Sequence, residues 1–447
     1  MQLIRGTLLM ASFAFLTACS SDSSDDSSPP PSGPAPEKVT VSGTITYDNV
    51  PHNTLTNGLD YNSATQDPVR GATIQALQGS SVIATSKTDE NGDYSFELNS
   101  NTDVKIRVRA ELTQSGTPGW NTKVIDNTSS GAIYVLDSAI FTTGTADQTR
   151  NLNAASGWSG SSYTSTRAAA PFHILDRVYD TIKKLEAVDS SIILPALNIN
   201  WSINNVAQSG DISQGQIGTS YYSNGQIYLL GAANSDTDEY DGHVIIHEWG
   251  HYFEDNLARS DSIGGSHAGG DRLDMRVAFG EGFGNAWAGI ITDDPYYRDS
   301  FGSSQAQGFS INVENNNVSN KGWFSEGSVQ AILYDIYDGL NDDTTSIGLL
   351  PIYEVLTSEQ KDSEAFTSIF SFITYLKDNN AAQVAQINSL INGQNIVTNI
   401  DIWGSNETNN GGDSTNLPVY VTLVPDNSAT EVCTNTTNGS DRNKLGN

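Results

Sequence analysis

The sequence predicts a multidomain protein, in which an N-terminal β-sandwich precedes an α+β domain that is mostly helical at its C-terminal end. The chain has 447 residues, enough for two or three domains. From residue 38 to about residue 112, apolar and polar residues alternate, which is typical of half-buried strands. From about residue 167, apolar residues recur every three or four positions, as they do on amphipathic helices.

The composition excludes several classes of partner and site. Asp and Glu number 52 against 22 Lys and Arg, so the formal charge is −30. A chain this acidic repels phosphate and anionic lipid, so we expect no nucleic-acid partner. Cys19 and Cys433 are the only cysteines of the sequence, which excludes a disulfide-rich scaffold and a cysteine-ligated zinc site.

Residues 1–18 predict a lipoprotein signal peptide. The apolar run Leu8 to Ala18 is too short to span a bilayer comfortably. It ends in Leu-Thr-Ala-Cys, which resembles the bacterial lipobox. This resemblance implies cleavage before Cys19 and acylation of Cys19, and an ordinary secretory signal is the alternative.

The residue after the lipobox cysteine bears on the compartment. Ser20 stands there rather than Asp, which by analogy favours a lipid-anchored protein of the bacterial outer membrane, facing the periplasm or the surface. Several acyl chains would anchor it stably. Residues 19–37 combine the lipidated cysteine with a Ser-, Asp- and Pro-rich stretch that we expect to be a disordered tether.

The predicted β-sandwich occupies residues 38–115. Its strands are expected around Val39–Ile45, Ala72–Ala76, Tyr94–Leu98 and Val104–Ala110. The segments Pro68–Ala72 and Thr88–Phe96 resemble the carboxypeptidase-regulatory-like (transthyretin-like) domain, which implies no peptidase activity in this module. We interpret residues 116–166 as a connecting β and loop region.

The second domain is predicted over residues 167–430. Its helices are expected at Phe172–Leu185, Asp241–Glu254, Val277–Ile291, Ser325–Tyr337 and Ala365–Leu376. Asn224-Gly225 between aromatic runs predicts a hairpin at Tyr221–Tyr228, and Val419–Val424 is strand-like. We expect residues 431–447 to be a disordered tail.

One predicted helix carries a metal-binding pattern. His247-Glu248-Trp249-Gly250-His251 places two imidazoles on the same helix face, one turn apart. Glu248 neighbours that face and can reach a zinc-bound water without ligating the metal. This is the H-E-x-x-H arrangement of zinc metallopeptidases, and it predicts one Zn²⁺ per chain on His247 and His251.

A catalytic zinc needs a third protein ligand. Six residues after His251 stands Leu257, not the third histidine of a metzincin. Glu281 opens the apolar helix that follows and is the preferred third ligand, and its flanking glycines would permit close approach to the metal. His267, Asp271 and Asp274 remain alternatives.

The order of motifs resembles the thermolysin-like and fungalysin-like gluzincins. The resemblance covers the Tyr222–Tyr228 hairpin, the zinc helix, Gly280–Phe283 and Ser325–Asp335. It implies a zincin-like metallopeptidase domain and a zinc metalloendopeptidase with Glu281 as a ligand. It further implies that a peptide lies extended against Tyr221 and Tyr222.

The sequence departs from this family in two places. The family has an Asp that orients a zinc-bound histidine where this chain has Asn285, whose amide oxygen still accepts a hydrogen bond. The family also has an oxyanion-stabilising histidine before the later helix, whereas this sequence has no histidine after His267. Tyr334 is the candidate for that role, with Tyr337 and Tyr252 as alternatives, and a tyrosine of the core or of the helix surface is the other interpretation of Tyr334.

The function expected from these residues is peptide-bond hydrolysis by a membrane-anchored monomer acting on peptides or proteins, with Glu248 as general base. Two alternatives remain open: a zinc-binding lipoprotein without turnover that serves as an adhesin or scaffold, and a zinc hydrolase of non-protein amides. Two acidic groups also form candidate Ca²⁺ sites or, alternatively, solvated acidic stretches: Asp342 and Asp343, and Asp236, Asp238, Glu239 and Asp241.

Overall fold

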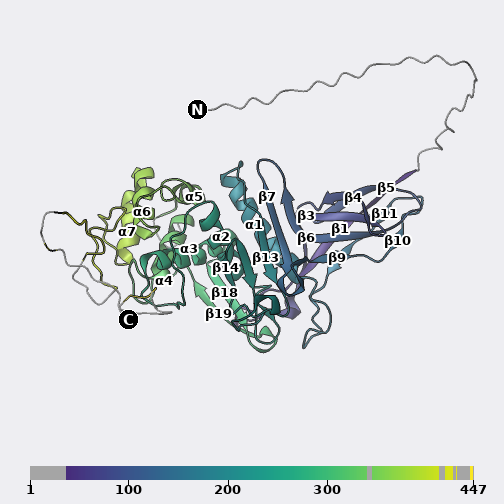
Figure 1. Ribbon diagram of the computed structural model, residues 1–447, viewed down its shortest axis with the longest axis horizontal. Helices are drawn as coiled ribbons and strands as arrows, with labels where there is room; N and C mark the ends of the chain where they lie inside the picture. Colours follow the sequence, from purple (N-terminus) through teal and green to yellow (C-terminus); the bar gives the residue numbers. More distant parts are fainter. Residues whose placement is uncertain (1–36, 340–344, 412–417, 426–428, 430–442, 446–447) are drawn as a thin grey trace, which may run out of the picture. The chain divides into compact units, whose positions relative to one another are not determined.

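The computed structural model describes residues 37–339, 345–411, 418–425, 429 and 443–445. The predicted signal peptide, Cys19 and nearly all of the tether lie outside the described residues, as do Asp342 and Asp343. Strands dominate up to residue 154 and helices dominate the later part (Figure 1). The β-rich N-terminal region and the helical C-terminal part are therefore confirmed.

A five-stranded sheet surrounds the first long strand. Strand β1 pairs in parallel with β11 and β12, and antiparallel with β2 and β5. Side chains alternate between buried and exposed along β5, as the period of two predicts. The bounds are β1 (Lys38–Asn49), β2 (Thr65–Pro68), β5 (Asp93–Asn99), β11 (Gln148–Thr149) and β12 (Leu152–Ala154).

A ten-stranded sheet links the two halves of the chain. Its main order is β14-β15-β13-β7-β6-β3-β4, with β8 paired to β7 and both β9 and β10 paired to β6. The bounds are β3 (Ala72–Gln78), β4 (Ser81–Lys87), β6 (Asp103–Gln114), β7 (Trp120–Asp126), β8 (Ala132–Ile133), β9 (Val135–Asp137), β10 (Phe141–Thr142), β13 (Leu197–Trp201), β14 (Tyr221–Ser223) and β15 (Gln226–Leu229).

This sheet crosses the predicted boundaries between domains. Strand β13 pairs in parallel with β7, with Leu197 opposite Thr122. One apolar cluster includes Val41 and Ile74 of the strands together with Phe253 and Phe283 of the helices. The region from Lys38 onward therefore behaves as one packed unit in its described part, and the division at residues 115 and 166 remains a prediction.

A smaller sheet lies beside the helices. Its order is β16-β17-β18-β19, and all of its pairings are antiparallel. The bounds are β16 (Gly231–Ala232), β17 (Asp236–Thr237), β18 (Tyr296–Phe301) and β19 (Gln307–Asn312).

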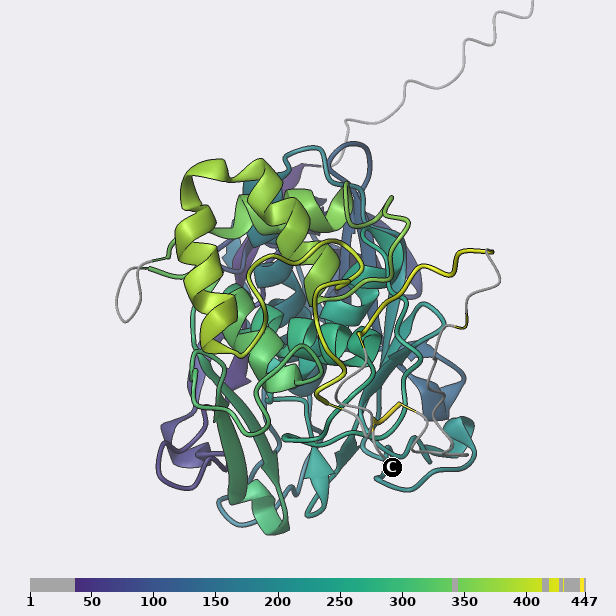
Figure 2. The same ribbon diagram turned by 90° about the vertical axis from the view of Figure 1, so that its left-hand side faces the viewer.

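The helices of the C-terminal part stack on one another. Helix α3 is mostly apolar, and all of its residues from Val277 to Ile291 except Glu281 are buried. Helices α6 and α7 lie in front of the other helices in Figure 2 and on the side away from β13 in Figure 1. The bounds are α1 (Ala170–Val188), α2 (Gly242–Asn256), α3 (Met275–Thr292), α4 (Glu326–Tyr337), α5 (Leu349–Thr357), α6 (Ile369–Asn379) and α7 (Val384–Gly393).

Aromatic rings fill the interface between α2 and α3. The Trp249 and Trp287 rings are parallel within 8°, with centroids 6.5 Å apart. Phe253 stacks on Trp287 with centroids 5.1 Å apart. All three side chains are buried, so this layer fixes the two helices against each other.

The predicted hairpin is present as β14 and β15. Asn224 and Gly225 form its turn with φ of 50° and 76°, the positive values that a two-residue type I′ turn requires. Strand β14 stands at the end of the strand order. The hairpin therefore gives the ten-stranded sheet an edge at β14.

Three local predictions differ from the structure. The helix expected from Ala365 begins at Ile369, because Ser368 and Ser371 form a capping box. Residues 419–424 form no strand. Of the predicted tail, Asn443–Leu445 is ordered by pairing with Arg272–Asp274, which supplies backbone hydrogen bonds that a frayed end lacks.

The helices in the described part of the chain are not of the membrane-spanning kind. None of them combines the length with the apolar character that crossing a bilayer requires.

Candidate metal centre

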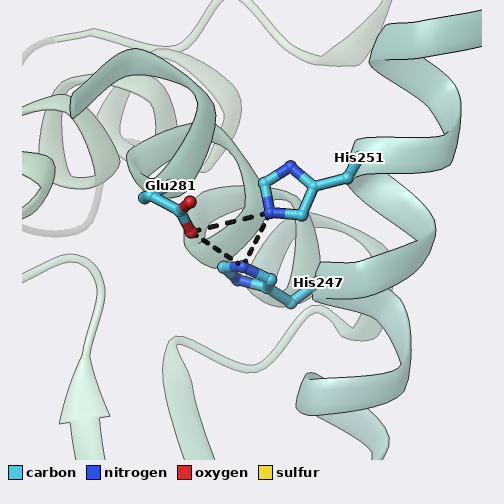
Figure 3. A group of neighbouring side chains, drawn as sticks. All are labelled: His247, His251 and Glu281. Atoms are coloured by element: carbon cyan, nitrogen blue, oxygen red, sulfur yellow. Dashed lines mark hydrogen bonds and ion pairs between the residues drawn. The ribbon is translucent and has the colours of Figure 1, made fainter. Parts of the chain in front are cut away.

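Helices α2 and α3 bring His247, His251 and Glu281 together, and we call these residues the metal trio (Figure 3). His247 Nε2 lies 3.1 Å from His251 Nε2. Glu281 Oε2 lies 3.4 Å from His247 Nε2 and 3.6 Å from His251 Nε2. Three ligand-type atoms from two helices therefore converge on one point.

These separations fit a zinc ion. Tetrahedral zinc with bonds of about 2.0–2.2 Å holds its ligand atoms roughly 3.4 Å apart. Two imidazole nitrogens and one carboxylate oxygen also form a donor set that catalytic zinc uses, with one position left for water. The metal trio is therefore compatible with zinc in both chemistry and spacing.

One glycine of α3 permits this convergence, and it is not one of the two that flank Glu281 in the sequence. A Cβ at Gly284 would lie 2.8 Å from the His247 ring, so the imidazole packs directly on the helix backbone. A Cβ at Gly282 would lie 2.6 Å from Val329, so this residue serves the close packing of α3 on α4. Of Gly282 and Gly284, it is thus Gly284 that makes room for a member of the metal trio.

The carboxylates in and around the metal trio stabilise positive charge there. Burial would raise the pKa of Glu281, but the His251 imidazole and hydrogen bonds from His247, His251 and His267 hold that pKa well below its usual range. Glu281 is therefore ionised, which is the form that binds a metal. Burial by itself would lower the pKa of His251. The Glu281 and Glu254 carboxylates outweigh this effect and raise the pKa of His251 well above its usual value.

Each histidine of the metal trio has a hydrogen-bond partner on its other ring nitrogen. Asn285 Oδ1 lies 3.0 Å from His247 Nδ1, and Asn285 Nδ2 donates to Gln330 Oε1 at 3.0 Å. Glu254 Oε2 lies 3.1 Å from His251 Nδ1. Such partners fix the ring orientation and raise the basicity of the metal-binding nitrogen.

Glu254 was missed by the sequence analysis. It lies on the same helix as His251, three residues later, and it is buried. The i, i+3 spacing on a helix was a usable signal. Glu254 supplies next to His251 the negative charge that Asn285 lacks next to His247.

Substituting Glu254 by glutamine should weaken zinc binding. The variant keeps the side-chain size but loses the charge that polarises His251, and loss of such a partner typically costs about 10- to 100-fold in metal affinity. Competition with a chromophoric chelator would measure the zinc dissociation constant. Asp255→Asn on the adjacent, solvent-facing position is the control, and equal effects of the two variants would contradict a specific role for Glu254.

His267 reaches the metal trio from the segment between α2 and α3, residues 258–274, which we call the His267 loop. His267 Nε2 lies 3.1 Å from Glu281 Oε2, and Nδ1 lies 3.0 Å from Glu326 Oε2. Hydrogen bonds to these two carboxylates raise the pKa of His267 to about 10. A carboxylate only accepts, so both ring nitrogens of His267 carry a proton.

Asp271 and Asp274, which the sequence also offered as third ligands, have partners away from the metal trio. Asp271 forms an ion pair with Lys444 at 2.8 Å. Asp274 caps α3 by accepting from the Arg276 backbone N–H at 3.0 Å. The described residues place neither of them in the metal trio.

Tyr334 does not face the metal trio, which corrects its assignment as oxyanion donor. Its ring packs at Gly289, roughly 12 Å along α3 from Glu281 at 1.5 Å per residue. Burial raises its pKa, and carboxylates at the far end of α3, led by Asp338, add to the effect. The α-helical register of α4 turns Tyr334 toward that end, where it lines a separate pocket of about 460 Å³.

Tyr337 and Tyr252, the two further candidates for the oxyanion donor, are also engaged away from the metal trio. Tyr337 donates a hydrogen bond to Asp293, the residue that ends α3. Tyr252 donates to the Pro195 carbonyl at 2.6 Å.

Glu248 and Tyr297 lie next to the metal trio. Glu248 follows His247 on α2, is 9% exposed and is not a member of the metal trio. The Tyr297 ring centroid lies 6.1 Å from that of His247. Burial raises the pKa of Tyr297, and the carboxylates of Asp299 and Glu248 raise it further, so it remains a neutral phenol. No pattern in the sequence singled out Tyr297, because it lies on β18, about fifty residues along the chain from His247.

Tyr221 and Tyr222 lie on the edge strand β14. Tyr222 donates to Asp255 of α2 at 2.6 Å. The Tyr221 ring stacks on Tyr228 with centroids 4.9 Å apart. The edge strand is thus held against the helix that carries His247 and His251.

A second cluster of carboxylates lies at one end of the small sheet. Oxygen atoms of Asp236, Asp238 and Asp299 lie within 4.8 Å of one another. Burial, followed by the charge of Asp241, raises the pKa of Asp299 to about 8. Not all of the predicted calcium ligands join this cluster. Glu239 forms an ion pair with Arg167 instead.

Asp241 also has partners outside that cluster. Its Oδ2 accepts from the Ser300 backbone N–H at 3.0 Å, and its Oδ1 lies 2.7 Å from His52 Nε2. Calcium binding therefore stays a prediction.

Comparison with known proteins relates the segment around the metal trio to a peptidase family. Residues 196–387 match the family model of the mycolysin C-terminal domain, which covers less than half of the chain but includes all three members of the metal trio. This match supports a relationship to metallopeptidases. No curated protein matches the chain.

One solved structure shows a remote similarity. It is a provisionally assigned carbohydrate binding protein of Pseudomonas aeruginosa, at 10% identity, with a TM-score of 0.17, covering 26% of this chain and 89% of that chain. A similarity at this level supports no inference about this chain.

Proposed function

We propose that this chain is a zinc-dependent metalloendopeptidase of the gluzincin type, with a zincin-like domain that carries the metal trio. The convergence of His247, His251 and Glu281 within 3.1–3.6 Å is the observation that carries the proposal. The match to the mycolysin C-terminal domain supports it. The resemblance to the thermolysin and fungalysin group, which includes the zinc helix and Gly280–Phe283, leads to the same expectation.

The proposed chemistry divides the work between the metal and Glu248. Bound zinc would act as a Lewis acid and lower the pKa of water toward neutrality. Glu248 takes a proton from the water as its oxygen forms a bond with the peptide carbonyl carbon. Glu248 then delivers that proton to the leaving nitrogen as the C–N bond breaks. The products are a carboxylic acid and an amine, so atoms and charge balance.

The edge strand suggests how a peptide binds. Strand β14 ends the sheet order and is tied to α2 through Tyr222 and Asp255. A substrate in extended conformation would add to this edge by backbone hydrogen bonds. We propose that Tyr221 and Tyr222 contact the substrate there.

The proposed setting rests on the sequence alone. We propose that Cys19 is acylated and anchors a monomeric enzyme to the bacterial outer membrane. The substrates would then be peptides or proteins outside the cytoplasm, and nucleic acid would not be a partner.

Metal removal tests the proposed function. The purified chain should cleave denatured casein, lose that activity with 1,10-phenanthroline and regain it when zinc is added back, because the active site depends on one metal. Stoichiometric zinc without cleavage of any protein would instead favour a scaffold or adhesin. Cleavage of cell-wall peptides but not of proteins would favour a hydrolase of non-protein amides.

A further inference from the structure

His267 lies next to the metal trio without belonging to it. All ligand atoms of the metal trio lie within 4.8 Å of one another, and His267 is not part of that group. It nevertheless approaches Glu281 Oε2 to 3.1 Å. His267 is therefore within one hydrogen bond of the metal-binding atoms but outside the set that would bind the ion.

The His267 side chain faces the accessible side of the site. It is 29% exposed, compared with 10% for His247 and 12% for Glu281. A pocket of about 330 Å³ adjoins it and is lined by Gly269, Gly270 and Glu326, among other residues. A substrate approaching the metal trio from this side would meet His267.

Glu326 orients the His267 ring. Its carboxylate lies 3.0 Å from His267 Nδ1, and it is buried at the N-terminus of α4. A buried acceptor on Nδ1 fixes the ring plane and keeps Nε2 directed at the metal trio. His267 thus has the orientation of its ring fixed by the Glu326 carboxylate, and its Nε2 is left to donate a hydrogen bond.

The His267 loop is held in place by a distant part of the chain. The Asp274 backbone N–H donates to the Asn443 carbonyl at 2.7 Å, and the Leu445 N–H donates to the Arg272 carbonyl at 2.7 Å. The Asn443 side chain donates to the Ser266 carbonyl at 3.1 Å. Residues 443–445 thus hold the His267 loop by hydrogen bonds both before and after Asp271.

We propose that His267, held by Glu326, is a catalytic residue that donates a hydrogen bond from Nε2 to the carbonyl oxygen of the scissile peptide bond as negative charge develops on that oxygen. This inference rests on the proposed peptidase function and assigns its missing oxyanion donor. Such a donor acts mainly in the transition state, because the carbonyl oxygen is most negative there. Tyr334, Tyr337 and Tyr252 all point away from the metal trio.

Substitutions that remove or keep the donor test this role. In His267→Phe, kcat should fall about 100- to 1,000-fold, the usual cost of one oxyanion donor. The affinity for a phosphinic peptide that mimics the transition state should fall by a similar factor, while KM changes little. His267→Gln, which keeps an N–H donor, should retain more activity than His267→Phe, and Glu326→Gln should show a smaller loss than His267→Phe.

Zinc affinity is measured in parallel on every variant by chelator competition. It should remain close to that of the wild type in His267→Phe. Glu186→Gln is the control, because it removes a largely exposed ion pair with Lys183 on α1 that involves neither the metal trio nor the His267 loop. It should leave kcat, phosphinic peptide binding and zinc affinity unchanged.

Four results would overturn the inference. If His267→Phe lost zinc but recovered full kcat at saturating zinc, His267 would only position Glu281. If Tyr297→Phe caused the loss and His267→Phe did not, the phenol would be the donor. If the wild type were active and His267→Phe kept its kcat, this inference alone would fail, whereas a zinc-loaded but inactive wild type would overturn the peptidase function and this inference with it.

Discussion

Glu248→Gln should abolish peptide cleavage and leave zinc binding intact. Glutamine has nearly the same size as glutamate but cannot accept the proton of the attacking water. Loss of a general base typically costs about 100- to 10,000-fold in rate, and a steady-state assay on a quenched fluorescent peptide would measure kcat/KM. The loss should appear in kcat, because Glu248 acts on the water rather than on substrate binding.

The zinc content of the same protein separates this role from a structural one. Glu248 is not in the metal trio, so the variant should bind one zinc with the affinity of the wild type. Glu186→Gln, which removes a largely exposed ion pair with Lys183 on α1, should retain activity. A Glu248→Gln protein that cleaves peptides at more than one tenth of the wild-type rate would contradict the general-base assignment, since about 100-fold is the minimum expected.

Glu281→Ala should remove both zinc and activity. The two remaining imidazoles lack the carboxylate that completes the ligand set. The affinity should fall by more than about 100-fold, the upper end of what loss of an outer hydrogen-bond partner costs. Zinc should also stop raising the unfolding temperature, because a ligand that no longer binds the native state cannot stabilise it.

His267→Phe is the informative comparison for Glu281→Ala. If Glu281 is the third ligand, zinc binding is lost in Glu281→Ala and retained in His267→Phe. The reverse pattern would make His267 the ligand and would contradict the assignment of Glu281. Differential scanning calorimetry with and without zinc distinguishes the two patterns.

Much of the fold follows from local patterns in the sequence. The period of two predicted the strands that became β1, β3, β5 and β6, because side chains alternate between the two faces of a strand. Asn224-Gly225 predicted the hairpin, because that dipeptide adopts the two positive φ angles of the turn. The recurrence of apolar residues predicted α1 to α4 to within a few residues.

The same local patterns could not predict which strands pair over long distances in the sequence. Strand β13 pairs with β7 across more than seventy residues, and no local signal specifies such a partner. The division into a sandwich, a connector and a second domain therefore followed the change in apolar period along the chain, whereas the ten-stranded sheet runs across those boundaries.

The candidate site likewise combines residues that local spacing predicts with residues that it does not. His247, Glu248 and His251 form one local motif on one helix, so their arrangement was readable from spacing alone. The position of His267 depends on the path of a Gly-rich loop with no regular structure. The expectation for Tyr334 was wrong. The order of motifs in the family correctly located helix α4, but it gave no information on the direction in which Tyr334 faces from that helix.

X-ray absorption spectroscopy at the zinc edge is the decisive measurement of whether His247, His251 and Glu281 bind one ion. On the purified chain loaded with zinc, we expect one zinc per chain, with nitrogen and oxygen neighbours at about 2.0–2.2 Å, two of them imidazoles. The Glu281→Ala protein, treated in the same way, should give no such signal. A wild-type chain that stays metal-free in excess zinc, or a spectrum with a single imidazole, would contradict the convergence of His247, His251 and Glu281 on one ion.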